Sequence, residues 1–154
     1  MINSVKTPVY NNSQVQSWRP IPGRNYCLFD EKKADYFVKQ GDKALPAVAD
    51  ILSKSNDEYQ ITETLYIANK MIDNGTKGFD KLYPYFARFN NTVSPNIQSF
   101  LAGIYRKTQV PDAFGPLAGM LIRNSLTPRQ NQTVDPNEEI GGALLSYISE
   151  KFRK

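Results

Sequence analysis

The sequence of 154 residues contains no histidine. Histidine is the side chain whose ordinary pKa lies nearest neutrality, and it is also the commonest metal ligand. Paired cysteines, a glycine-rich phosphate loop after a strand and a nucleophile elbow are missing too. Each of these absences removes a common form of catalysis. We therefore predict a non-catalytic protein without a metal or cofactor, and we interpret Glu58 and Glu63 as solvated helix carboxylates.

Cysteine and long apolar runs are also scarce. The single Cys27 cannot form an intramolecular disulfide, so a reducing compartment is expected. It lies in a short apolar run without a histidine to activate its thiol, which indicates a buried small hydrophobe. No run of about eighteen apolar residues occurs, and residues 1–6 lack the apolar run of a signal peptide. The sequence predicts a cytoplasmic protein that does not enter a membrane.

Charge is mildly positive and unevenly distributed. The chain carries 19 basic and 15 acidic side chains, for a net charge of +4. Residues 30–73 hold nine acidic and six basic side chains, whereas residues 76–132 hold seven basic and two acidic ones. This distribution would suit an acidic partner. A positive excess of this size is also found where it only keeps a protein soluble.

One apolar pattern occurs three times in the middle of the chain. Segment 41–52 matches segment 75–86 at an offset of 34 residues, and segment 110–121 follows at a further 35. Four small or apolar positions recur in this register: Ala44, Gly78 and Ala113; Leu45, Phe79 and Phe114; Val48, Leu82 and Leu117; and Leu52, Phe86 and Leu121. A period in this range indicates stacked helix pairs, because each pair needs a neighbour to bury its apolar face.

Start and stop signals divide the chain into about seven helices and no sheet. The predicted pairs cover 30–53, 57–89 and 95–124, and a last helix begins at residue 136. Asp30 and Ser94 are expected as N-caps, and Gly41 as the left-handed end of the first helix.

Two local features of these helices are also predicted. A capping box of Ser55 and Glu58 is expected to open the third helix. Pro84 falls in the middle of a predicted helix over 77–89, where a missing backbone donor should produce a kink.

Three regions follow from these assignments. Residues 1–29 contain several prolines and are predicted to be an extended or partly disordered arm, in which Trp18 either packs on the stack or recognises a partner. Residues 30–125 form the stack of about three helix pairs. Residues 126–154 form a loop and a C-terminal capping helix, whose alternative role is binding to a partner or a membrane surface.

The segment Ala-Leu-Pro-Ala-Val-Ala-Asp-Ile-Leu at 44–52 resembles the second helix of a HEAT-type repeat, and the segment 113–121 is similar. The resemblance covers roughly residues 30–125. It implies a short right-handed α-α superhelix of antiparallel helix pairs whose second helices line the concave face. Most HEAT-like proteins are protein-binding scaffolds, and some bind nucleic acid. The aspartate ladder of longer arrays is incomplete, since Asp50 has no acidic counterpart at Pro84 or Gly119.

A series of cations follows the same period. Lys54, Arg88 and Arg123 occupy equivalent repeat positions, again 34 and 35 residues apart. Each lies in the last turn of its predicted helix, where a cation offsets unsatisfied carbonyl groups. The functional alternative is a positive strip that meets an acidic protein or nucleic-acid phosphates. That strip would also include Lys77, Lys81, Arg106 and Lys107.

The sequence thus predicts an all-α module that binds a protein partner, with an acidic partner suiting its cations. Binding of nucleic acid or another acidic ligand through the positive strip is the alternative. The repeat region has no tryptophan to stack on bases, which weakens that alternative.

Overall fold

The computed structural model describes residues 29–126 and 135–152, and this range contains helices and no β-strand. The helices are α1 (Glu31–Gln40), α2 (Leu45–Lys54), α3 (Glu58–Asp73), α4 (Tyr83–Ala87), α5 (Pro95–Thr108), α6 (Phe114–Leu126) and α7 (Pro136–Phe152). Short 3-10 turns precede the second helix of each pair: η2 (Gly41–Ala44), η3 (Phe79–Leu82) and η4 (Pro111–Ala113). The all-α prediction is confirmed. Trp18 and Cys27 lie outside the described residues.

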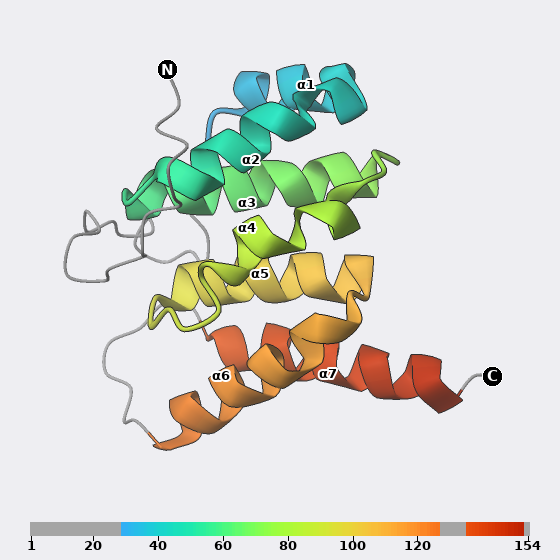
Figure 1. The fold of residues 1–154 in the computed structure, drawn as a ribbon. Helices are drawn as coiled ribbons and strands as arrows, with labels where there is room; N and C mark the ends of the chain where they lie inside the picture. Colours follow the sequence, from blue (N-terminus) through green and yellow to red (C-terminus); the bar gives the residue numbers. More distant parts are fainter. Residues whose placement is uncertain (1–28, 127–134, 153–154) are drawn as a thin grey trace.

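The helices stack in chain order, from α1 and α2 at one end to α6 and α7 at the other (Figure 1). α1 contacts α3, α3 contacts α5, and α5 contacts α7, so the odd-numbered helices form one continuous layer. α2, α4 and α6 lie in front of this layer in Figure 1, and α2 contacts α4. Each successive pair therefore adds one helix to each layer.

The turn inside each pair contains a residue with positive φ, and these residues recur every 34 positions. Gly41 has φ 61°, Gly75 has φ 96° and Gln109 has φ 55°. Glycine adopts such angles readily, whereas Gln109 needs compensating contacts. Its side-chain Nε2 donates to the Arg106 carbonyl oxygen and to the Ser146 hydroxyl, both at 2.8 Å. The bond to Ser146 ties the third turn to α7.

The predicted kink at Pro84 is wrong. Segment 77–89 is not one helix, because Gly78 adopts a left-handed conformation with φ 102°, η3 follows it, and α4 begins only at Tyr83. Pro84 thus lies in the first turn of α4, where the N–H that proline lacks has no intrahelical acceptor. Pro46 has the corresponding place in α2.

The buried column at the end of the second helices differs from the predicted one in the third pair. Leu52 and Phe86 are buried, but Leu121 is only partly buried, and Met120 is fully buried in its place. An α-helix has 3.6 residues per turn, so a buried stripe advances by three or four residues. After Leu117 the step is three residues, which turns Met120 toward the core.

The N-caps are partly as predicted. The Asp30 carboxylate accepts from two N–H groups of α1, and the Ser94 hydroxyl accepts from the Ile97 N–H of α5. The predicted capping box is wrong, because Asp57, not Ser55, is the N-cap of α3. Ser55 Oγ accepts instead from the Asp57 N–H, and Glu58 accepts a hydrogen bond from the Ser94 hydroxyl.

Candidate binding surfaces on the helix stack

One edge of the stack contains the carboxyl-terminal ends of α2, α4 and α6, and we call it the ladder edge. Two arginines there bind backbone carbonyl groups of the preceding helix pair. Arg88 Nη1 donates to the carbonyl oxygens of Leu52 at 2.6 Å and Ser55 at 2.8 Å. Arg123 Nη2 donates to the Asn90 carbonyl oxygen at 3.0 Å. The same contact thus repeats from one pair to the next.

The remaining contacts at the ladder edge are also internal. Arg88 Nη2 donates to Asn56 Oδ1 at 2.8 Å, and its guanidinium lies 5.0 Å from the ring centre of Phe89. Lys54 belongs to the first pair and forms an ion pair with Asp50 at 3.1 Å. These geometries favour the interpretation of the arginines as helix-end cations, which here act on the neighbouring pair rather than on their own helix.

The other four predicted cations lie at the opposite edge, and we call it the cationic edge. Odd-numbered helices end there and even-numbered helices begin there, because the two helices of a pair run antiparallel (Figure 1). Lys77 and Lys81 lie between α3 and α4, and Arg106 and Lys107 lie in the last turn of α5. The structure therefore divides the predicted strip between two edges that are separated by the length of the helices.

A hollow of about 320 Å³ opens at the cationic edge, between the end of α3, η3 and the end of α5. Lys77 and Lys107 both line it, together with Thr76, Thr108 and one acid, Asp80. The Thr108 hydroxyl oxygen is buried, and it has no hydrogen-bond partner among the described residues. Ammonium and hydroxyl groups are donors that bind carboxylate or phosphate oxygens. The hollow can therefore accept an anionic group.

Lys107 is partly neutralised by neighbours on α3. Its ammonium lies 2.9 Å from Asp73 Oδ1 and 2.9 Å from Asn69 Oδ1. The buried Asn69 amide in turn donates to the Phe100 carbonyl oxygen at 3.1 Å. Lys107 thus helps to tie α3 to α5.

The other three cations of this edge are available to a ligand. Lys77, Lys81 and Arg106 are exposed, and within the described ranges none of their side chains has a hydrogen-bond or ion-pair partner. Arg106 and Lys107 also line a second hollow of about 260 Å³, together with Phe100 of α5 and Glu139 of α7. Two carboxylates, Asp73 and Glu139, line this second hollow beside the cations.

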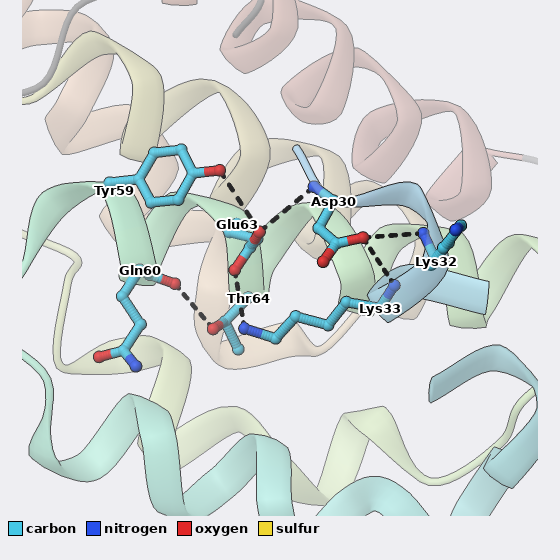
Figure 2. A network of polar contacts seen from close by, with 7 residues as sticks. All are labelled: Asp30, Lys32, Lys33, Tyr59, Gln60, Glu63 and Thr64. Atoms are coloured by element: carbon cyan, nitrogen blue, oxygen red, sulfur yellow. Dashed lines mark hydrogen bonds and ion pairs between the residues drawn. The ribbon is translucent and has the colours of Figure 1, made fainter. Parts of the chain in front are cut away.

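A buried acid lies near the start of α1, where sequence reasoning expected a solvated side chain. Glu63 is only 5% exposed. Its Oε1 accepts from Lys33 Nζ at 2.9 Å, and its Oε2 lies 3.5 Å from the Tyr59 hydroxyl and the Asp30 N–H (Figure 2). These contacts fasten α1 to α3 and use both carboxylate oxygens. The expectation failed because α3 lies between α1 and α5 and is covered on several sides.

A second acid on α1 forms a surface cluster with α3. Glu31 Oε2 accepts from the Tyr66 hydroxyl at 2.6 Å, and Glu31 Oε1 accepts from Lys70 Nζ at 2.9 Å. The bond from Tyr66, followed by that from Lys70, lowers the pKa of Glu31. Burial and the bond to Glu31 raise the pKa of Tyr66. The ring of Phe29 stacks on Tyr66 with 4.8 Å between centres, which joins the start of the described chain to α3.

Two further tyrosines are held neutral inside the stack. The Tyr105 hydroxyl donates to Asn90 Oδ1 at 2.6 Å, and burial raises the Tyr105 pKa far above its ordinary value. The Tyr147 hydroxyl donates to the Val110 carbonyl oxygen at 2.6 Å, and burial raises the pKa of Tyr147 to about 12. Both act as structural hydrogen-bond donors between the second and third pairs and α7.

Comparison of the chain with protein-family models, curated proteins and solved structures finds no match. Across residues 29–126 and 135–152, no group of three or more histidine, cysteine, aspartate or glutamate side chains is arranged to hold a metal ion. None of the helices described is long and apolar enough to cross a membrane.

Proposed function

We propose that this chain is a non-catalytic protein-binding module that receives an acidic segment of a partner at its cationic edge. The observation that carries the proposal is the difference between the two edges. Arg88 and Arg123 donate hydrogen bonds to backbone carbonyl groups, whereas Lys77 and Arg106 are exposed, and Lys77 lines a hollow that can accept an anion. The free donors are therefore concentrated at one edge.

The architecture supports this proposal. Three helix pairs add successively to two layers, and a positive-φ turn residue recurs every 34 positions at Gly41, Gly75 and Gln109. We propose that the pairs form a short right-handed HEAT-like superhelix, as the resemblance of segment 44–52 implies. Such stacks present extended surfaces built from several repeats, which suits recognition of a protein segment.

The geometry gives less support to nucleic-acid binding. A bound strand places a row of phosphates along the protein, and neutralising each one needs a nearby cation. The predicted strip is divided between two edges, and Asp73, Asp80 and Asp112 are interspersed along the cationic edge. A short acidic peptide needs only a few cations at one place, so it fits this surface better.

The proposal is tested by fluorescence anisotropy, with a labelled polyglutamate peptide and a labelled random single-stranded DNA as probes. The edge variant combines Lys77→Glu, Lys81→Glu and Arg106→Glu, and it spares the structural Lys107. We expect the edge variant to bind polyglutamate at least about tenfold more weakly, because three ion pairs of up to about 1 kcal/mol each become repulsions.

The matched control combines Lys32→Glu, Lys54→Glu and Arg123→Glu at the opposite edge, and circular dichroism checks that loss of the Arg123 bond to the Asn90 carbonyl oxygen leaves the helices intact. Three reversals lower the net charge from +4 to −2 in both variants, so any general effect of charge is the same. Equal losses in the two variants would contradict a localised site. Tighter binding of DNA than of polyglutamate, with an affinity that falls steeply with salt and is lost in the edge variant, would favour the nucleic-acid alternative.

A further inference from the structure

The cationic edge continues into the first helix pair, whose two cations at this edge were not predicted from the sequence. Lys39 lies in the last turn of α1, and Lys43 lies in η2, between α1 and α2. Figure 1 shows this turn on the same side of the stack as the ends of α3 and α5. Both side chains are exposed, and within residues 29–126 and 135–152 neither has a hydrogen-bond or ion-pair partner. The first turn thus adds two free cations to this edge.

Direct contacts join the first turn to the second turn, and the second turn to the third. Leu45, which follows η2, lies so close to Gly78 that a Cβ at Gly78 would be 2.9 Å from Leu45 Cδ1. Lys77 is the residue before Gly78, and it lines the hollow of about 320 Å³ together with Lys107 of α5. The cations of the three turns therefore lie along one continuous edge.

The sequence repeat explains why cations recur at these turns. Lys43 and Lys77 each lie two residues after the positive-φ glycine of their turn, and they are 34 residues apart. In the third turn the exposed cation is Arg106, which comes from the end of α5. At least one exposed cation is therefore present at the turn of every pair.

The distance between successive turns sets the spacing of the acids that this edge can bind. α3 packs on α1 and α5 packs on α3, and packed helices lie about 8–10 Å apart. A polyproline II segment has three residues per turn and rises by about 3.1 Å per residue, so every third side chain points to the same side at intervals of about 9.3 Å. A β-strand repeats on one side at only about 6.6 Å, which is too short. An extended segment with acids at every third position therefore matches the edge.

Acidic side chains between the cations also favour spaced acids in the partner. An aspartate is exposed in the 3-10 turn of each pair: Asp42 in η2, Asp80 in η3 and Asp112 in η4. These aspartates would repel an unbroken run of carboxylates. Carboxylates separated by neutral residues can contact the cations while the neutral residues lie over the aspartates.

We propose that the cationic edge binds an extended acidic segment of a partner protein, which crosses all three turns and carries an acid at every third position. A segment of about seven residues spans the two intervals and places one carboxylate at each turn. The cations that meet these carboxylates are, in order along the edge, Lys39 and Lys43, Lys77 and Lys81, and Arg106. This inference rests on the proposed function, because it names the length and the acid pattern of the same partner.

The test compares two labelled peptides by fluorescence anisotropy with the full chain. Both peptides contain the same numbers of glutamate, proline and serine residues. The spaced peptide has glutamate at every third position, and the clustered peptide has all its glutamates together. The spaced peptide should bind about tenfold more tightly, because it forms ion pairs at three turns at once whereas the clustered peptide reaches only one.

A first-turn variant tests the part of the edge that the proposed function does not require. It combines Lys39→Gln and Lys43→Gln. This variant should bind the spaced peptide about fivefold more weakly and the clustered peptide within about twofold of the wild type, because the second turn still receives clustered acids. The matched control, Lys32→Gln with Lys54→Gln, removes the same charge at the ladder edge and should bind both peptides as the wild type does.

The outcomes separate this inference from the proposed function. Equal affinity for the spaced and clustered peptides, unchanged binding by the first-turn variant, or an equal loss in the control would overturn the inference. The proposed function would still hold in those cases if reversing Lys77, Lys81 and Arg106 weakened binding of polyglutamate. Failure of the wild type to bind any of the peptides, polyglutamate included, would contradict both.

Discussion

Phe86 shows how much one side chain contributes to this stack. It is 1% exposed in the middle pair, and its ring centre lies 6.3 Å from that of Phe79. Residues with this environment are surrounded by neighbours that cannot collapse fully into the space left by a smaller side chain. The stability of the second pair should therefore depend strongly on this ring.

Replacing Phe86 by alanine should lower the free energy of unfolding by about 3–5 kcal/mol, through lost burial and a residual cavity. Urea unfolding followed by circular dichroism measures this loss. Tyr36→Ala is the control, because Tyr36 is 62% exposed and should change stability by less than about 0.5 kcal/mol. A loss for Phe86→Ala as small as that of the control would show that Phe86 is not in the core.

Two hydrogen-bonded tyrosines, the buried Tyr105 and the partly buried Tyr147, make the fold less stable at alkaline pH. The pKa of Tyr147 is about 12 in the fold against an ordinary value of 10, and that of Tyr105 is raised further. The folded state thus holds these protons more tightly than the unfolded chain does. Their contribution to stability is complete below pH 10 and is lost as the pH rises from 10 toward 12.

Unfolding by urea at a series of pH values above 9 should show this loss. The slope of the unfolding free energy with pH should correspond to at least two protons released on unfolding, one each from Tyr105 and Tyr147, with a further contribution from Tyr66, whose pKa is also raised. Tyr147→Phe should reduce the slope by about one proton, although it also removes the hydrogen bond to the Val110 carbonyl oxygen. A stability that stays flat through pH 11 would contradict the burial of these hydroxyl groups.

At the scale of elements, Gly78 holds a left-handed conformation at the start of η3, beside Leu45 of the first pair. A Cβ at this position would lie 2.9 Å from Leu45 Cδ1, and the φ of 102° is strained for any other residue. Gly78→Ala should therefore lower stability by about 1–3 kcal/mol. Differential scanning calorimetry of this variant and its control provides the measurement.

Gly142 supplies the control for Gly78. It is exposed inside α7 with an ordinary φ, and a Cβ there would meet nothing within 4 Å beyond its own helix and chain neighbours. Gly142→Ala should raise stability by up to about 1 kcal/mol, because alanine loses less backbone entropy in a helix. A melting temperature of Gly78→Ala that is not lower than that of the wild type would contradict the strained conformation at Gly78.

The helices themselves could be predicted because their signals are local. Asp30 and Ser94 cap helices in the structure, and the apolar periodicity places the cores of α2, α3 and α5. The 3-10 turns were missed, because glycine and proline mark a break without saying which helical form fills it. Gln109 was missed as the third positive-φ residue since glutamine rarely adopts that conformation.

The edge at which each cation lies depends on the tertiary arrangement. The prediction of one continuous positive strip did not take this arrangement into account. In an antiparallel pair, the end of the first helix and the end of the second lie at opposite edges. Arg106 ends a first helix and Arg88 ends a second helix, so their separation follows from the pairing alone. The capture of the Leu52 and Ser55 carbonyl groups by Arg88 joins successive pairs, and one repeat considered alone cannot show it.

At the scale of the whole molecule, the two edges of the stack differ in what their cations contact. Arginines of the ladder edge connect successive pairs, whereas Lys77, Lys81 and Arg106 of the cationic edge are exposed, and Lys77 lines a hollow. Substitutions at the ladder edge should therefore change stability, and substitutions at the cationic edge should change binding of the proposed acidic partner.

The most direct test compares Arg88→Gln with Arg106→Gln, each measured for stability in urea and for binding of polyglutamate. Arg88→Gln should lose about 1.5–3 kcal/mol of stability, because charged hydrogen bonds to carbonyl groups are broken, and its affinity should be unchanged. Arg106→Gln should keep its stability within about 0.5 kcal/mol and bind polyglutamate more weakly. The reverse pattern, with binding lost at Arg88 and stability lost at Arg106, would contradict the account.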